Sequence, residues 1–188
     1  MTTTTERLGD LVAAAREGIG FYEYAVTRID LITMTVVMRS MAMVRYDLVK
    51  ALGPEVPTHR HQLPDEESVH LQAQRVYRRM RAEMCRIPSG DDVAELVRHE
   101  ATLIEALGDL LRKDSEGSGH PRTSECLRVH LPRMQTCQAE LERQQLHLAA
   151  FRDALIHAEE TINEPGPARW QVEADQGETP RAVGSADR

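Results

Sequence analysis

The chain has 188 residues, a formal net charge of −7 and a composition that is 41% hydrophobic but only 4% aromatic. Its length suits one compact domain with room for a short tail. The negative charge excludes a general binder of phosphate backbones, which needs clustered lysine and arginine. The scarcity of aromatic side chains excludes a surface that stacks nucleobases. We therefore expect no nucleic-acid partner.

The cysteines and the apolar segments indicate where the protein functions. Cys85, Cys126 and Cys137 are too few for a disulfide framework. The N-terminus lacks a basic region followed by an apolar stretch, as a secretory signal would have. The most apolar run, Leu31–Met38, meets Arg39 well before the roughly 20 residues that a membrane span requires. We expect a soluble, cytoplasmic protein without a membrane partner.

Five helices are predicted from apolar residues that recur every three or four positions. The first begins with a capping box at Thr3 and Glu6, and Asp30 is expected to cap the second. Pro132 either kinks the last helix or lies in the first turn of its main part. The predicted helices span about Glu6–Ile29, Leu31–Leu52, Asp65–Ile87, Asp92–Lys113 and Pro121–Asn163.

The four long helices predict an all-α bundle over residues 4–163, with the helix Asp65–Ile87 as a shorter accessory. Residues 164–188 contain three prolines and three glycines, which predicts a disordered tail. In the second helix the residues expected to face inward are Met34, Val37, Met41, Val44, Leu48 and Leu52. In the third they are Val69, Ala73, Val76, Met80, Met84 and Ile87. In the last they are Cys137, Leu141, Gln144, Leu148, Phe151, Leu155, Ala158 and Ile162.

Polar residues on these apolar faces are the candidates for chemistry, because burying them costs free energy unless they are paired. Glu100 lies in the middle of the apolar face of the fourth helix. Gln144 takes a similar position on the last helix, with His147 three residues further on, and Glu23 follows Tyr22 on the first helix. Polar positions on three helices predict one polar layer across the bundle.

Several short motifs resemble a ferritin-like family, specifically a bacterial family of unknown function built as a single four-helix bundle. The resemblance covers about Thr4 to Ile156. The motifs that carry it are Glu17-Gly18-x-x-x-Tyr22-x-x-Ala25, Arg45-Tyr46 with Leu48, Arg98-His99-Glu100-Ala101 and, more loosely, Phe151-Arg152-Asp153. The resemblance implies a ferritin-like bundle, the fold in which di-metal centres are placed within a polar layer.

A di-metal centre requires one Glu from each of two helices and Glu-x-x-His from each of the other two. This chain departs from that pattern, since the second helix has no Glu-x-x-His and Gln144 replaces a carboxylate on the last. Two interpretations follow. Either Glu100 is a buried acid paired with Arg45 and no cofactor is bound, or Glu23, Glu100 and His147 retain a reduced site for iron or another divalent metal.

Other clusters have simpler interpretations. His59, His61 and His70 form a histidine group that is expected to be solvated, and Cys126 with His130 lacks the four ligands of a zinc site. The methionine stripe is typical of core filling. The third helix is locally basic, which predicts a solvated face, a docking face for an acidic partner or a subunit contact. Its arginines are Arg75, Arg78, Arg79, Arg81 and Arg86.

These observations predict a non-enzymatic helical bundle with a role in association or stress, through self-association or a protein partner. The alternative is a metal-binding or redox ferritin-like protein with the reduced site.

Overall fold

The computed structural model describes residues 3–56, 68–84, 86–113 and 121–163. It is all-helical over these residues, as predicted, with no strand among them. The helices are α1 (Thr4–Arg28), α2 (Ile32–Leu52), the 3-10 turn η1 (Gly53–Glu55), α3 (Val69–Glu83), α4 (Gly90–Lys113) and α5 (Pro121–Asn163). Within the described residues, no helix is long and apolar enough to cross a membrane.

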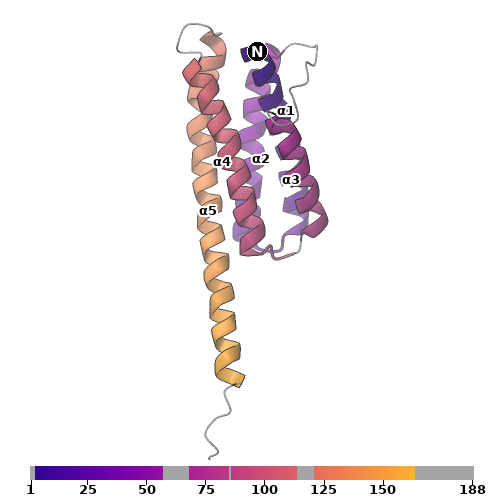
Figure 1. Cartoon of the computed structure of the whole chain (residues 1–188), viewed down its shortest axis with the longest axis vertical. Helices are drawn as coiled ribbons and strands as arrows, with labels where there is room; N and C mark the ends of the chain where they lie inside the picture. The colour runs from indigo at the N-terminus through magenta and orange to yellow at the C-terminus, as the bar shows by residue number, and fades with distance from the viewer. Residues whose placement is uncertain (1–2, 57–67, 85, 114–120, 164–188) are drawn as a thin grey trace, which may run out of the picture. The chain divides into compact units, whose positions relative to one another are not determined.

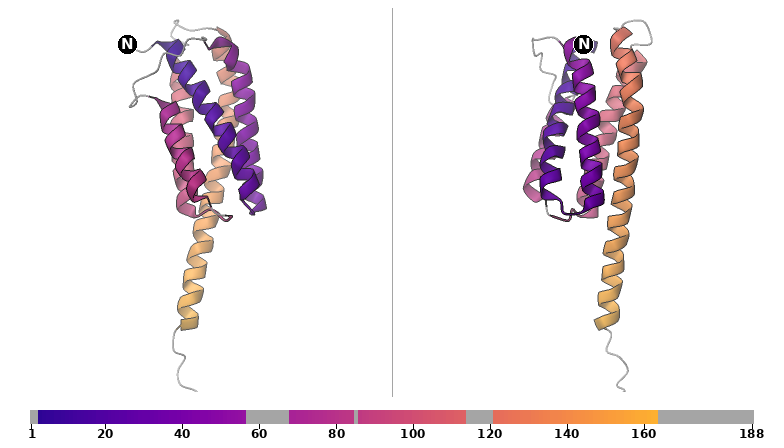
Figure 2. Two further views of the ribbon diagram at one scale, coloured as in Figure 1. Left: turned by 90° about the vertical axis from the view of Figure 1, so that its right-hand side faces the viewer. Right: turned by 180° about the vertical axis from the view of Figure 1, so that it is seen from behind.

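The chain divides into two compact units, Met1–Arg152 and Asp153–Arg188. In the first unit α1 lies between α2 and α3 and contacts both, and α4 contacts α1 and α3 (Figures 1 and 2). Leu131 and Ala149 of α5 lie close to Gly108 and Gly90 of α4. The predicted tail, residues 164–188, lies outside the described residues, as do residues 57–67 and 114–120.

Local capping explains where α1 begins but not where α2 begins. The predicted capping box of α1 is confirmed, since the Thr3 side chain accepts from the Glu6 backbone and the Glu6 side chain accepts from Thr3. The predicted cap at Asp30 is wrong, because Leu31 takes the capping position of α2 without a side-chain hydrogen bond. Asp30 is engaged elsewhere: its backbone N–H donates to the Arg86 carbonyl, and its carboxylate lies 3.6 Å from the Arg86 guanidinium.

The third helix is shorter than predicted and contributes more to the core than an accessory would. It buries Ala73, Tyr77 and Met80, which share one helical face. The predicted inward position of Ile87 is wrong, because this residue lies beyond the end of α3 and is 62% exposed. Val76 is only half-buried. The inward face of α3 is therefore centred on Tyr77.

The apolar face of α2 agrees with the prediction, and that of α5 agrees except near one end. All six predicted positions of α2 are buried. On α5, Leu141 and Gln144 are buried, but Phe151 is 62% exposed, Leu155 is 50% exposed and Ala158 is exposed as well, so these three inward assignments are wrong. The side chain of Ile162 lies outside the described residues. The reason for Phe151 is geometric: α4 begins at Gly90, which lies against Ala149, so Phe151 lies beyond the first turn of α4.

Candidate functional site

Glu100 of α4 lies at the centre of a group of buried polar side chains. Its side chain is fully buried, and it pairs with the guanidinium of Arg45 from α2, which is 1% exposed. The hydroxyls of Tyr22 from α1 and Tyr77 from α3 both donate to its Oε1 atom, the latter at 3.0 Å. We call Tyr22, Arg45, Tyr77 and Glu100 the polar centre. One residue from each of four helices thus meets at a single carboxylate.

The surroundings of Arg45 complete this arrangement. The guanidinium carbon lies 4.8 Å from the centroid of the Tyr22 ring, a cation–π contact, and Nη1 donates to the Met41 carbonyl at 3.3 Å. Gly18 of α1 makes room for the arginine: a Cβ atom there would lie 2.7 Å from Arg45 Nε and 3.1 Å from the Tyr77 hydroxyl. The glycine of the first motif is therefore explained by close approach of a buried arginine.

Aromatic rings seal the polar centre from water. The Phe21 ring stacks on Tyr77 with centroids 4.7 Å apart, and the His99 ring meets Tyr77 edge-on at 4.9 Å. Burial raises the pKa of Tyr22 well above its ordinary value and also raises the pKa of Tyr77. Both hydroxyls therefore stay protonated near neutral pH and act as donors to the carboxylate.

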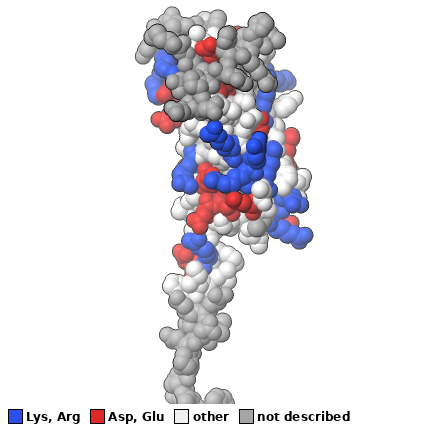
Figure 3. Space-filling view, turned by 45° about the vertical axis from the view of Figure 1, so that its right-hand side comes forward, with Lys and Arg blue, Asp and Glu red and all other residues white. Residues whose placement is uncertain are grey.

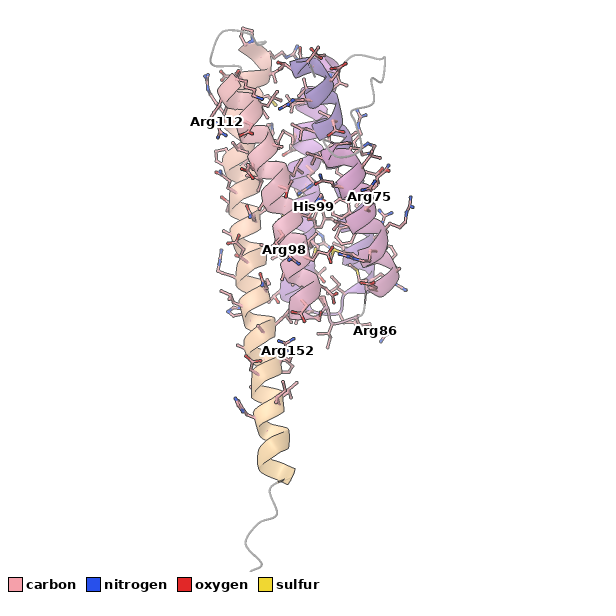
Figure 4. The ribbon with its side chains drawn as sticks, in the orientation of Figure 1. Arg75, Arg86, Arg98, His99, Arg112 and Arg152 are labelled. Carbon is pink, nitrogen blue, oxygen red and sulfur yellow. The ribbon has the colours of Figure 1, made fainter. Side chains whose placement is uncertain are left out.

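His99 is the second titratable group beside the polar centre. It is 6% exposed and lies on the side of α4 that faces α3 (Figure 4). Burial, helped by the positive charge of Arg45, lowers its pKa to about 4, so the ring is neutral near pH 7. Its Nε2 atom has no hydrogen-bond partner within the part of the chain that the structure describes.

The structure does not bring the three predicted metal ligands together. Glu100 is buried, whereas Glu23 and His147 are both exposed. Gln144, which was expected in the same polar layer, donates to Glu140 of its own helix at 3.2 Å. In the described ranges no group of three or more His, Cys, Asp or Glu side chains has the geometry of a metal site. The predicted pairing of Glu100 with Arg45, by contrast, is confirmed.

The other sequence candidates also find places in the structure. His70 lies 3.6 Å from Glu17 and 3.1 Å from Gln74, while His59 and His61 lie outside the described residues. Cys126 and Cys137 are half-buried free thiols, and burial raises the pKa of each. The methionine stripe is buried, which agrees with core filling. Its members are Met34, Met38 and Met41.

The basic residues of α3 are partly engaged within the chain. Arg79 pairs with Glu95 of α4, and the Arg81 guanidinium lies 5.9 Å from the centroid of the Tyr24 ring. Figure 3, which brings the side of α3 forward, shows basic side chains with acidic ones next to them. Arg78 is exposed. Because Arg79 is engaged by another helix whereas Arg78 is exposed, the docking face on α3 stays a prediction.

Sequence reasoning missed two members of this site. Tyr77 was overlooked because the neighbouring Val76 was assigned to the inward face, although Tyr77 lies four residues after Ala73 and three before Met80. His99 appeared only as part of a motif, yet its burial follows from its position three residues after Leu96. Helical spacing alone could have identified both.

Comparison of the chain with protein-family models, with curated proteins and with solved structures finds no match. The ferritin-like resemblance therefore stays a prediction that depends on the motifs quoted for it.

Proposed function

We propose that this protein is a non-enzymatic helical bundle of the ferritin-like type that acts by association with another polypeptide, in a cytoplasmic structural or stress-related role. The observation that carries the proposal is that residues of the same chain occupy both oxygen atoms of the Glu100 carboxylate. Its carboxylate is fully buried, pairs with Arg45 and accepts from two tyrosine hydroxyls. In this proposal the polar centre holds four helices in register.

The chemistry of Glu100 supports this interpretation. A carboxylate that serves as a metal ligand or a general base must present a lone pair to an ion or a substrate. Here Oε1 receives two hydroxyl donors, and a fully buried guanidinium lies at Oε2. Removing one partner of such a buried pair typically costs about 3–5 kcal/mol, because the other charge is then left uncompensated. The arrangement suits a structural role.

The outer surface supports association. Among the residues that the structure describes, ten large apolar side chains are exposed, and such groups mark interaction surfaces when they lie next to one another. They are Ile32, Val36, Met43, Tyr46, Ile87, Val129, Leu146, Phe151, Leu155 and Ile156.

Metal analysis tests the proposal against the metal-binding alternative. The purified protein is reconstituted without oxygen with Fe(II) or Zn(II), dialysed, and analysed for bound metal beside Glu100→Gln and His147→Ala. We expect far less than one equivalent of metal per chain in all three proteins. One equivalent in the parent protein that is lost in both variants would contradict the proposal and establish a site at Glu23, Glu100 and His147.

A further inference from the structure

The outward side of α2 carries a second regular pattern. Its residues recur at intervals of 4, 3, 4, 3 and 4 positions, and all of them are exposed. We call this set the outer stripe; it consists of Ile32, Val36, Arg39, Met43, Tyr46 and Lys50. Its four large apolar members are Ile32 (79% exposed), Val36 (58%), Met43 (62%) and Tyr46 (60%). Figure 2 shows α2 uncovered in the view from behind.

The four apolar members of the outer stripe, separated by 4, 7 and 3 positions, share one face of α2, which distinguishes them from apolar residues exposed singly. Single exposed apolar side chains are normal on a protein surface. Alternating intervals of three and four, in contrast, form the seam along which two helices pack against each other. The inward face of α2 is complete without these residues, since it buries Met34, Met41 and Leu48 among others. The outer stripe is therefore available for another helix.

We infer that the outer stripe is the interface through which two copies of this chain associate, with their α2 helices antiparallel about a two-fold axis. This inference rests on the proposed function and names its partner. The spacing is symmetric about residue 41, so in an antiparallel pair every member faces another member. Val36 of one copy then faces Tyr46 of the second copy, which buries apolar surface at two equivalent places.

Charge selects the antiparallel orientation. In a parallel pair Arg39 would face Arg39 and Lys50 would face Lys50, and like charges at such short range repel. In the antiparallel pair Arg39 faces Met43 of the second copy and Lys50 faces Ile32, so their aliphatic stems cover apolar side chains. In the antiparallel pair Asp47 of the second copy faces position 35, and Arg39 lies four residues, about 6 Å, from that position along α2. An arginine side chain can span that distance to the carboxylate.

The size of the outer stripe is compatible with a specific dimer. A specific interface needs on the order of 1,000 Å² of buried surface from both partners together. Tyr46 is the one aromatic member of the outer stripe, and an aromatic side chain buries on the order of 150 Å² or more. The other three apolar side chains and the aliphatic stems of Arg39 and Lys50 would supply the rest of the interface from each copy.

Sedimentation equilibrium over a range of protein concentrations tests the inference. We expect a monomer–dimer equilibrium for the parent protein and a dissociation constant raised at least about tenfold by Met43→Glu. The matched control is Leu146→Glu on α5, since Leu146 is 65% exposed and Met43 is 62% exposed. This control should leave the dissociation constant unchanged. Circular dichroism of each variant verifies that its helices are retained.

A charge reversal tests the orientation. Arg39→Glu should weaken the dimer, because it places a carboxylate near Asp47 of the second copy. Combining it with Asp47→Arg should restore the affinity in an antiparallel pair only. Asp47 accepts from Arg133 of its own chain at 2.8 Å, but both side chains are more than 40% exposed, so the loss of that pair has a small effect on stability.

Two outcomes would overturn the inference: a parent chain that is monomeric at every concentration, or equal dimer affinities for Met43→Glu and Leu146→Glu. A failure to restore affinity in the double variant would overturn the antiparallel orientation. None of these results changes the metal analysis, which judges the proposed function separately.

Discussion

Glu100 and Arg45 occupy the centre of the core as charged residues, which is unusual because transferring a charge out of water costs several kcal/mol. The cost is offset here by an ion pair, two hydroxyl donors and a cation–π contact. In the ion pair and the cation–π contact, the Arg45 side chain passes close to the backbone of α1. Gly18 is the residue that permits this approach.

Gly18→Ala should destabilise the protein by about 1–3 kcal/mol, because the added methyl group would clash with the middle of a fully buried arginine. Urea denaturation monitored by circular dichroism measures the change. The matched control is Gly20→Ala on the same helix, where the added Cβ would meet only the tip of the exposed Arg81, at 3.3 Å. This control should be neutral or stabilising by up to about 1 kcal/mol, because alanine is the better helix former. Equal losses in both variants would contradict the packing role of Gly18.

At the scale of elements, α3 is attached to α1 through its N-terminus. The Asp10 carboxylate of α1 accepts from the backbone N–H groups of Val69 and His70, at 2.8 and 3.3 Å, and from the Ser68 hydroxyl at 2.6 Å. Ser68 in turn caps the helix by accepting from the Leu71 backbone. The first N–H groups of a helix lack partners within it and carry partial positive charge. A carboxylate from a neighbouring helix therefore both caps α3 and positions it.

Asp10→Ala should lower the free energy of unfolding by about 1–2 kcal/mol, since it removes the acceptor of two helix N–H groups and a buried hydroxyl. Relative to the parent protein, the hydrogen-exchange rates of the variant should increase more at the first turn of α3 than at α2. Thr3→Ala is the matched control, because it removes a helix cap at the exposed start of α1. Loss of protection at α3 in this control as well would show that the effect is not specific to Asp10.

At the scale of the whole molecule, α1, α2, α3 and α4 each supply one member of the polar centre, so protonation beside it is linked to global stability. The relevant group is His99, whose pKa is lowered to about 4 from an ordinary value of 6.5. The unfolded chain therefore binds a proton at His99 at a higher pH than the folded protein does. This contribution to stability is complete above pH 6.5 and is lost as the pH falls towards 4.

Acidification from pH 7 to pH 4 should accordingly remove up to about 3 kcal/mol through His99. The measurement is the free energy of unfolding in urea as a function of pH for the parent protein and for His99→Phe. The variant should have a flatter profile over this window, and the difference between the two curves isolates His99 from the carboxylates that titrate nearby. Parallel curves would contradict the assignment. Replacement of the exposed His147 by Gln serves as the control.

The sequence by itself determined the all-helical class, because apolar spacing and capping are local properties. The ends of α5, the capping box at Thr3 and the inward face of α2 all followed from residues a few positions apart. The burial of Glu100 followed from its place on an apolar face, and Arg45 could be named as its partner because it lies next to the inward-facing Val44 of α2.

Only the tertiary structure decided which polar residues meet. Glu23 and His147 have helical spacings compatible with a shared layer, but the packing of the helices turns both outward. Tyr77 enters the polar centre because α3 packs along α1. The position of α3 along α1 is set by Asp10, which binds the N-terminus of α3. The exposure of Phe151 likewise depends on where α4 begins beside α5. The periodicity of apolar residues specifies which face of each helix is buried. The contacts between helices depend also on how each helix is rotated about its axis, how far it is shifted along its neighbours and which helices are neighbours. Residues distant in the sequence determine these together.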